Sequence, residues 1–218
     1  MSAISLPFPE PLADKYRPTT VEEFCGLTQP KKIMNRFIAN PYASEWLFIG
    51  PSGTGKTSMG LAVAKAVDAE LHHIPSQQCT AAYVNEVCFK CYSVPILLDP
   101  WRAGKFHLVL VDEADQMTDG AQLAFLSKLD ATAKPPQTIF IFTCNAKDRL
   151  QDRFLSRCRK VEFSSYGMSS GISELLQRIW FGEGQTTEKM PNFQRIAKES
   201  NNNVRDALMT LEVELMGA

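Results

Sequence analysis

The stretch Gly50-Pro51-Ser52-Gly53-Thr54-Gly55-Lys56-Thr57 decides the fold of this chain. It matches the pattern G-x-x-x-x-G-K-[ST], a loop whose backbone wraps around phosphate groups, which requires a strand before it and a helix after it. Residues 46–49 form a short apolar run that indicates a buried strand, and residues 58–67 have a helical pattern. The loop therefore predicts an α/β protein that binds a nucleotide through Gly50 to Ser58.

The residue types in this loop have separate tasks. Glycines such as Gly53 and Gly55 let the backbone approach the phosphates without a side-chain clash, and the start of the following helix presents free N–H groups. Lys56 reaches the outer phosphates, and the Thr57 hydroxyl can ligate Mg²⁺. The expected ligands are ATP and Mg²⁺.

Two further apolar runs end in polar residues. The run 108–111 leads into Asp112 and Glu113, and the run 138–143 leads into Cys144 and Asn145. The carboxyl ends of parallel strands are where open α/β sheets bind ligands. We expect Asp112 to hold Mg²⁺ together with Thr57, Glu113 to orient or deprotonate an attacking water, and Asn145 to hold that water or the terminal phosphate.

The order of the remaining patterns predicts the fold class. Apolar runs at 46–49, 70–74, 106–111, 138–143 and 161–163 alternate with helical stretches, which is typical of a five-stranded parallel sheet between helices. Past residue 166 the strand signals stop. We therefore expect an α/β nucleotide-binding domain at 1–165, with an extended proline-rich arm to about Pro18, and a small all-helical lid at 166–218.

The composition excludes several classes of protein. The chain has 218 residues, a formal net charge of −1 and 44% hydrophobic residues, which favours a globular protein over a disordered or polybasic one. Its apolar runs are too short to cross a bilayer, and its start lacks the pattern of a secretory signal. We expect a cytoplasmic protein whose six cysteines are reduced thiols.

Together these motifs resemble the clamp-loader group of the AAA+ ATPases, over about residues 12–215. The glycine loop and the acidic strand correspond to the Walker A and Walker B motifs, and Asn145 corresponds to sensor 1. The segment Asp14-Lys15-Tyr16-Arg17-Pro18 is similar to the amino-terminal box of the group. The resemblance implies that Tyr16, Arg17 and Pro18 lie beside the adenine.

The resemblance also assigns two arginines. Ser156-Arg157-Cys158 looks like the Ser-Arg-Cys motif of clamp loaders, which implies that Arg157 acts in the ATP site of a neighbouring subunit. The segment 203–208 is similar to the sensor 2 helix, which implies that Arg205 closes the lid over the phosphates. Without the resemblance, the sequence favours an ordinary surface arginine at position 157, within the basic cluster of Arg149, Arg153, Arg157, Arg159 and Lys160.

Two features depart from the group. Clamp-loader subunits continue into a helical collar domain, and none is expected in this chain. The gamma/tau subunits carry a four-cysteine zinc site, and Cys79, Cys88 and Cys91 have similar spacing, but Val94 stands where the fourth ligand is expected. His72 or His73 could complete such a site. Because a closed structural zinc site needs four ligands, zinc is not expected at these cysteines.

The sequence thus favours an ATP-binding and ATP-hydrolysing module of a clamp-loader-like assembly. The implied partners are other AAA+ subunits in a homo- or hetero-oligomer, a sliding clamp and primer-template DNA, with no membrane. Two alternatives stay open: another AAA+ motor that processes DNA, such as a branch-migration or recombination-associated ATPase, or a regulatory subunit that binds ATP with little turnover.

Overall fold

The centre of the molecule is a five-stranded parallel sheet in the order β2-β3-β4-β1-β5. The computed structural model describes residues 10–93, 106–130 and 132–217. The expected strands are confirmed, with bounds that shift by no more than two residues: β1 (Ser44–Ile49), β2 (Glu70–Ile74), β3 (His107–Val111), β4 (Thr138–Cys144) and β5 (Arg159–Glu162).

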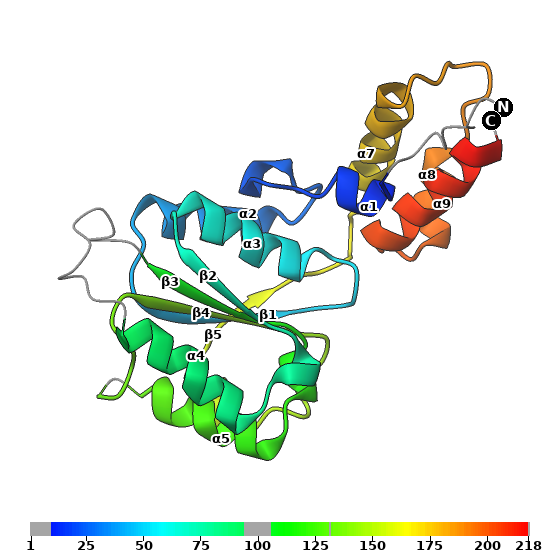
Figure 1. The fold of residues 1–218 in the computed structure, drawn as a ribbon. Coiled ribbons are helices and arrows are strands. Elements are labelled where there is room, and N and C mark those ends of the chain that lie inside the picture. Colours follow the sequence, from blue (N-terminus) through cyan, green and yellow to red (C-terminus); the bar gives the residue numbers. More distant parts are fainter. Residues whose placement is uncertain (1–9, 94–105, 131, 218) are drawn as a thin grey trace, which may run out of the picture.

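Helices cover both faces of the sheet, which confirms the predicted fold class (Figure 1). On one face lie α2 (Thr28–Ala39) and α3 (Lys56–Ala66), and on the other lie α4 (Ala81–Ser93) and α5 (Asp119–Lys128). Short helical segments connect these elements: η1 (Val21–Glu23), η2 (Ser76–Gln78), η3 (Ala114–Gln116) and α6 (Asp152–Leu155).

The two central strands explain why the sequence shows continuous apolar runs. Every residue of β3 and β4 is buried, because both faces of these strands are covered by helices. The face toward α5 carries an aromatic cluster in which the ring centroids of Phe125 and Phe142 lie 5.0 Å apart and those of Phe142 and Phe154 lie 4.9 Å apart. This packing fixes the strand ends that carry the polar residues.

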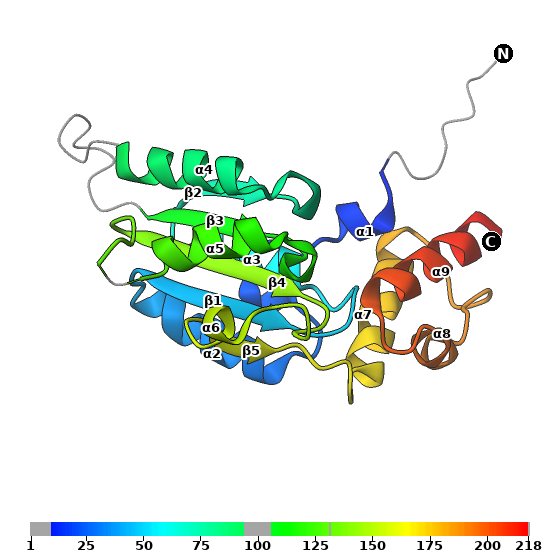
Figure 2. The ribbon, with the colours of Figure 1, turned by 90° about the horizontal axis from the view of Figure 1, so that it is seen from below.

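A second group of helices lies beyond one end of the sheet, where β5 leads out of it (Figures 1 and 2). It consists of α7 (Ser169–Gly182), α8 (Phe193–Glu199) and α9 (Val204–Gly217), which pack against one another. Their buried residues include Ile172, Trp180, Ile196 and Leu211. This is the helical lid expected from the sequence.

The prediction of an extended arm up to Pro18 was wrong in part. The arm contains a short helix, α1 (Leu12–Lys15), which packs on α9 and buries Leu12 completely. Pro11 precedes the first turn, where a missing N–H costs nothing, so it does not prevent this helix. Because α1 packs with the lid, the division into 1–165 and 166–218 stays a prediction.

The helix α3 lies unusually close to the sheet at Gly60. A Cβ atom at this position would lie 2.7 Å from Leu110 Cδ1 of β3, so any side chain there must displace the core. No described helix is long and apolar enough to cross a membrane.

Gly60→Val should therefore lower the free energy of unfolding by roughly 1–3 kcal/mol, because overpacking pushes α3 away from the sheet. The measurement is urea denaturation of the full chain. Gly120→Val is the matched control, since a Cβ at Gly120 would come no nearer than 3.9 Å to Thr118 Oγ1. The control should change stability by less than about 0.5 kcal/mol. Equal losses in the two variants would contradict the close packing at Gly60.

Candidate nucleotide-binding site

The phosphate loop connects the end of β1 to the start of α3 and depends on its glycines. Gly53 and Gly55 have φ angles of +74° and +90°, in the left-handed region that favours glycine. A Cβ at Gly53 would also lie 1.9 Å from Oδ1 of Asn203, next to the start of α9. The lid therefore touches the loop, and only glycine fits at that contact.

Lys56 is buried within the loop that precedes it. Its Nζ donates hydrogen bonds to the carbonyl oxygens of Gly50 (2.6 Å) and Pro51 (2.8 Å) and to Oδ1 of Asn145 (3.0 Å). Burial holds the pKa of Lys56 below its ordinary value, although the nearby negative charges, including Asp112, oppose this shift. The ammonium thus joins the loop to the end of β4, as expected if Lys56 and Asn145 serve one site.

Asp112, at the end of β3, is the centre of a hydrogen-bond network. Its Oδ1 accepts hydrogen bonds from Oγ1 of Thr57 (2.6 Å) and from Oγ1 of Thr143 (3.0 Å). The structure therefore brings together Thr57 and Asp112, the two predicted Mg²⁺ ligands. The sequence did not identify Thr143 as a site residue, although its position near the carboxyl end of β4 could have indicated it.

His73 is a second residue that sequence reasoning did not place at this site. Its Nε2 lies 2.9 Å from Oδ2 of Asp112, so both carboxylate oxygens of Asp112 have partners. The contact follows from the strand order, because β2 lies beside β3 and pairs Ile74 with Val111. The sequence pattern does not reveal which strand neighbours β3, so it could not identify this contact.

Glu113 lies at the rim of the site in a left-handed backbone conformation, with φ at 48°. Its N–H donates to Oγ1 of Thr143 (3.1 Å), and its Oε2 accepts from Oγ of Ser76 (3.3 Å). The side chain is exposed. Glu113 is therefore next to Asp112 but turned toward η2, and a rotation of its side chain would be needed to face the loop.

A large cavity of about 1050 Å³ opens between the loop, the arm and the lid. This volume lies slightly above the usual range of about 300–1,000 Å³ for small-molecule sites, so it is large enough for a nucleotide. The cavity is lined by ten of the predicted site residues: Tyr16, Arg17, Pro18, Gly53, Thr54, Gly55, Thr57, Ser58, Asp112 and Arg205.

The arm forms the far wall of this cavity. The Tyr16 hydroxyl donates a hydrogen bond to Glu183, just after α7, and Lys15 Nζ lies 2.8 Å from the same carboxylate. Burial, followed by the hydrogen bond to Glu183, raises the pKa of Tyr16 to about 12. These contacts join the arm to the lid.

Arg157 is not among the residues that line the cavity. It is exposed in the turn between α6 and β5, and its Nη1 donates to the carbonyl oxygen of Arg153 at 2.8 Å. Within one chain, the structure therefore does not bring Arg157 together with Lys56 and Asp112.

The three cysteines whose spacing is similar to the gamma/tau zinc site, and at which zinc is not expected, do not form a common cluster among the described residues. Cys79 follows η2, whereas Cys88 and Cys91 are buried in α4, and Val94 lies outside the described residues. All six cysteines of the chain are free thiols.

The residues present suit a magnesium nucleotide. The left-handed Gly53 and Gly55 leave a cradle without side chains. Thr57 and Asp112 offer a hydroxyl and a carboxylate oxygen 2.6 Å apart. Oxygen donors of this kind, completed by substrate phosphates and water, are what Mg²⁺ uses in phosphate sites.

Replication factor C subunits are among the known proteins with similar sequences. The chain is 30% identical over 202 residues to replication factor C small subunit 1 of Pyrobaculum islandicum, covering 92% of this chain and 60% of that protein. It is 28% identical over 206 residues to replication factor C subunit 3 of Blastobotrys adeninivorans, covering 93% and 59%. The chain thus spans about 60% of the length of these relatives.

Among solved structures, the fold is similar to the RuvB Holliday junction branch migration motor of Thermotoga maritima. The TM-score is 0.72 at 18% sequence identity, over 90% of this chain and 64% of that chain. At this identity the likeness concerns the fold alone.

The family comparison covers the part of the chain that carries the phosphate loop and the acidic strand end. Residues 46–166, more than half of the chain, match the family described as "ATPase family associated with various cellular activities (AAA)". This span starts within β1 and includes the other four strands of the sheet. The chain belongs to the AAA family.

Proposed function

We propose that this chain binds ATP with Mg²⁺ and hydrolyses it as one subunit of a clamp-loader-like assembly that acts on DNA. The observation that carries the proposal is the convergence of Lys56, Thr57, Asp112 and Asn145 at one end of the sheet, beside a cavity of about 1050 Å³. The similarity to replication factor C subunits supports the type of assembly.

In this proposal the loop from Gly50 to Ser58 holds the triphosphate. The backbone N–H groups at the start of α3 face the phosphates, and the ammonium of Lys56 exchanges the carbonyl oxygens of Gly50 and Pro51 for phosphate oxygens. The adenine lies against the arm, beside Tyr16, Arg17 and Pro18, which line the same cavity.

Thr57 and Asp112 would hold Mg²⁺, which neutralises charge on the outer phosphates. To do so, Asp112 must give up the hydrogen bonds that it now accepts from Thr57 and shares with His73. Thr143 can continue to hold one carboxylate oxygen in place. The network therefore orients Asp112 before a ligand arrives.

Glu113 is the residue proposed to assist hydrolysis. Its carboxylate leaves Ser76, accepts a proton from the attacking water, and so helps the water oxygen to form its bond to the γ-phosphorus. The bond from this phosphorus to the bridging oxygen breaks, leaving ADP and phosphate. Asn145 orients the water or the terminal phosphate, and Arg205 of the lid adds positive charge on the same side.

Arg157 is proposed to complete the site of a neighbouring subunit. Its guanidinium is exposed and does not line the cavity of its own chain, so it is available to a second AAA subunit. An arginine supplied in this way stabilises the charge that develops on the transferred phosphoryl group. The further partners in this proposal are a sliding clamp and primer-template DNA, and the six free thiols fit a cytoplasmic site of action.

The likeness to RuvB supports a branch-migration motor as the second candidate, through the fold alone. The response to different DNA structures distinguishes a clamp loader from a branch-migration motor. If the chain acts in clamp loading, primer-template DNA should raise the rate of ATP hydrolysis more than a four-way junction of equal length, in a steady-state phosphate-release assay. Lys56→Ala supplies the background rate. A stronger response to the junction would overturn the clamp-loader proposal and favour the motor.

A mixing experiment tests Arg157. Arg157→Ala and Glu113→Gln should each lose turnover, by about 10³-fold for the arginine. When the two variants are mixed, some interfaces combine an intact Glu113 with an intact Arg157 from the next chain, so turnover should return. The matched control is Arg153→Ala, an exposed neighbour that should retain activity by itself. A mixture no more active than its components would contradict a role of Arg157 in trans.

A further inference from the structure

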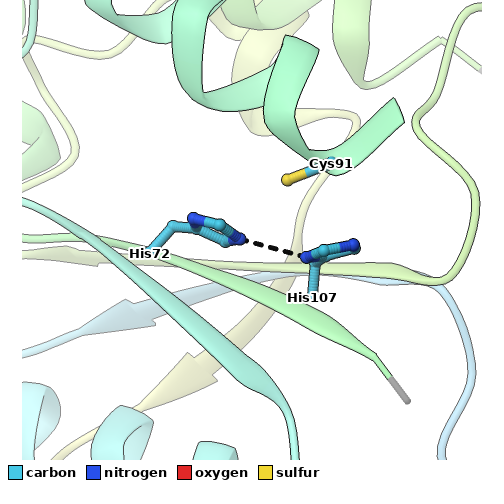
Figure 3. A group of neighbouring side chains, drawn as sticks. All are labelled: His72, Cys91 and His107. Atoms are coloured by element: carbon cyan, nitrogen blue, oxygen red, sulfur yellow. Dashed lines mark hydrogen bonds between the residues drawn. The ribbon is translucent and has the colours of Figure 1, made fainter. Parts of the chain in front are cut away.

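A group of metal-binding side chains lies on the face of the sheet covered by α4, away from the phosphate loop. It consists of His72 on β2, His107 on β3 and Cys91 on α4, and each residue offers a donor atom within 4.8 Å of the other two (Figure 3). His72 Nε2 and His107 Nδ1 lie 3.0 Å apart. In Figure 3 the sulfur of Cys91 lies above the two imidazole rings.

Strand register creates this group. Glu70 pairs with His107 and His72 pairs with Val109, so His72 and His107 are on the same face of two adjacent strands. The next residue, His73, points to the opposite face, where it contacts Asp112. The two adjacent histidines of β2 therefore lie in different sites: His73 contacts the nucleotide site, and His72 lies in the group on the opposite face.

We propose that His72, Cys91 and His107 bind one zinc ion. Two imidazoles and a thiolate are the donor types that zinc prefers in proteins. Tetrahedral zinc would place the two nitrogens about 3.3 Å apart, and nitrogen and sulfur about 3.6 Å apart. The two nitrogens lie 3.0 Å apart, and the sulfur lies within 4.8 Å of both, so side-chain rotations that bring the sulfur nearer to the rings would form the site.

Water, or Glu70 after exchange of its present contacts, would supply the fourth zinc ligand. Oε2 of Glu70 lies 3.7 Å from Nδ1 of His107, and the side chain of Glu70 is 44% exposed. Its carboxylate can therefore turn toward the ion without breaking into the core. This ligand set differs from the spacing pattern of Cys79, Cys88 and Cys91, of which it uses Cys91 alone.

Zinc binding requires defined proton changes. The hydrogen bond between the rings must break, and the ring that donates it must shift its proton to its other nitrogen, so that both facing nitrogens present lone pairs. Cys91 releases its thiol proton to solvent as the sulfur–zinc bond forms. The positive charge of the ion would stabilise the thiolate at this buried position.

A bound zinc ion would stabilise the edge of the sheet that β2 forms. β2 is the outermost strand on its side of the sheet, and it pairs only with β3 among the described strands. A zinc ion would link β2, β3 and α4 through three side chains. The bound ion should therefore raise the melting temperature of the chain, because it binds the folded state alone.

Titration of the metal-free full chain with Co²⁺, with Mg²⁺ in excess, tests the site. Co²⁺ replaces zinc, and its bond to a thiolate gives a charge-transfer absorption band. The wild type should bind one Co²⁺ per chain with this band, and Zn²⁺ should displace the Co²⁺. Cys91→Ser should lose the band. His72→Gln changes a half-buried side chain, so the variant should fold. It should weaken Co²⁺ binding by more than about 10-fold, because even the loss of a residue that only hydrogen-bonds to a metal ligand lowers metal affinity by about that much.

The matched control is Cys79→Ser, which changes a buried cysteine outside the cluster and should keep the band and the affinity. Circular dichroism of each variant verifies folding, and His72→Gln decides the question if Cys91→Ser does not fold. Absence of the band in the wild type would overturn the proposal and leave only a hydrogen bond between two histidines. Loss of the band in Cys79→Ser, or its survival in Cys91→Ser, would also overturn the proposed ligand set.

Discussion

The hydrogen bond from Thr57 to Asp112 ties the phosphate loop to the acidic end of β3, and the geometry of the site depends on it. β1 and β3 are not neighbours, because β4 lies between them in the sheet. Thr143 and Asn145, at the end of β4, bond to Asp112 and Lys56 and so fill this gap. Three strand ends are thereby held together by hydrogen bonds, as expected for a preorganised site.

The cavity depends on the lid as much as on the sheet. Asn203 caps the start of α9 and also touches the loop at Gly53, while Tyr16 and Lys15 fasten the arm to Glu183 beyond α7. A nucleotide between these walls would contact the sheet, the arm and the lid together. The two walls of the cavity therefore come from different parts of the chain, the sheet on one side and the arm with the lid on the other.

The sequence predicted the parts that depend on local pattern, and it missed those that depend on which elements become neighbours. The glycine loop, the five strands and the lid helices all carry local signals of spacing and apolar runs. The contact between His73 and Asp112, and the group of His72, Cys91 and His107, require that β2 lies beside β3 under α4. Likewise, helix α1 is stabilised by the burial of Leu12 against the lid. The prolines of the arm predicted an extended segment there, because the sequence pattern does not show this contact.

The most direct test of the account is a crystal structure of the chain with Mg²⁺ and a non-hydrolysable ATP analogue. The account predicts phosphates at the N–H groups of Gly53 to Thr57, with Lys56 Nζ moved from the carbonyl oxygens of Gly50 and Pro51 to phosphate oxygens. The metal ion should lie between Thr57 and Asp112, with the base beside Tyr16. A nucleotide bound elsewhere, or a Lys56 that keeps its bonds to the loop carbonyls, would contradict the account.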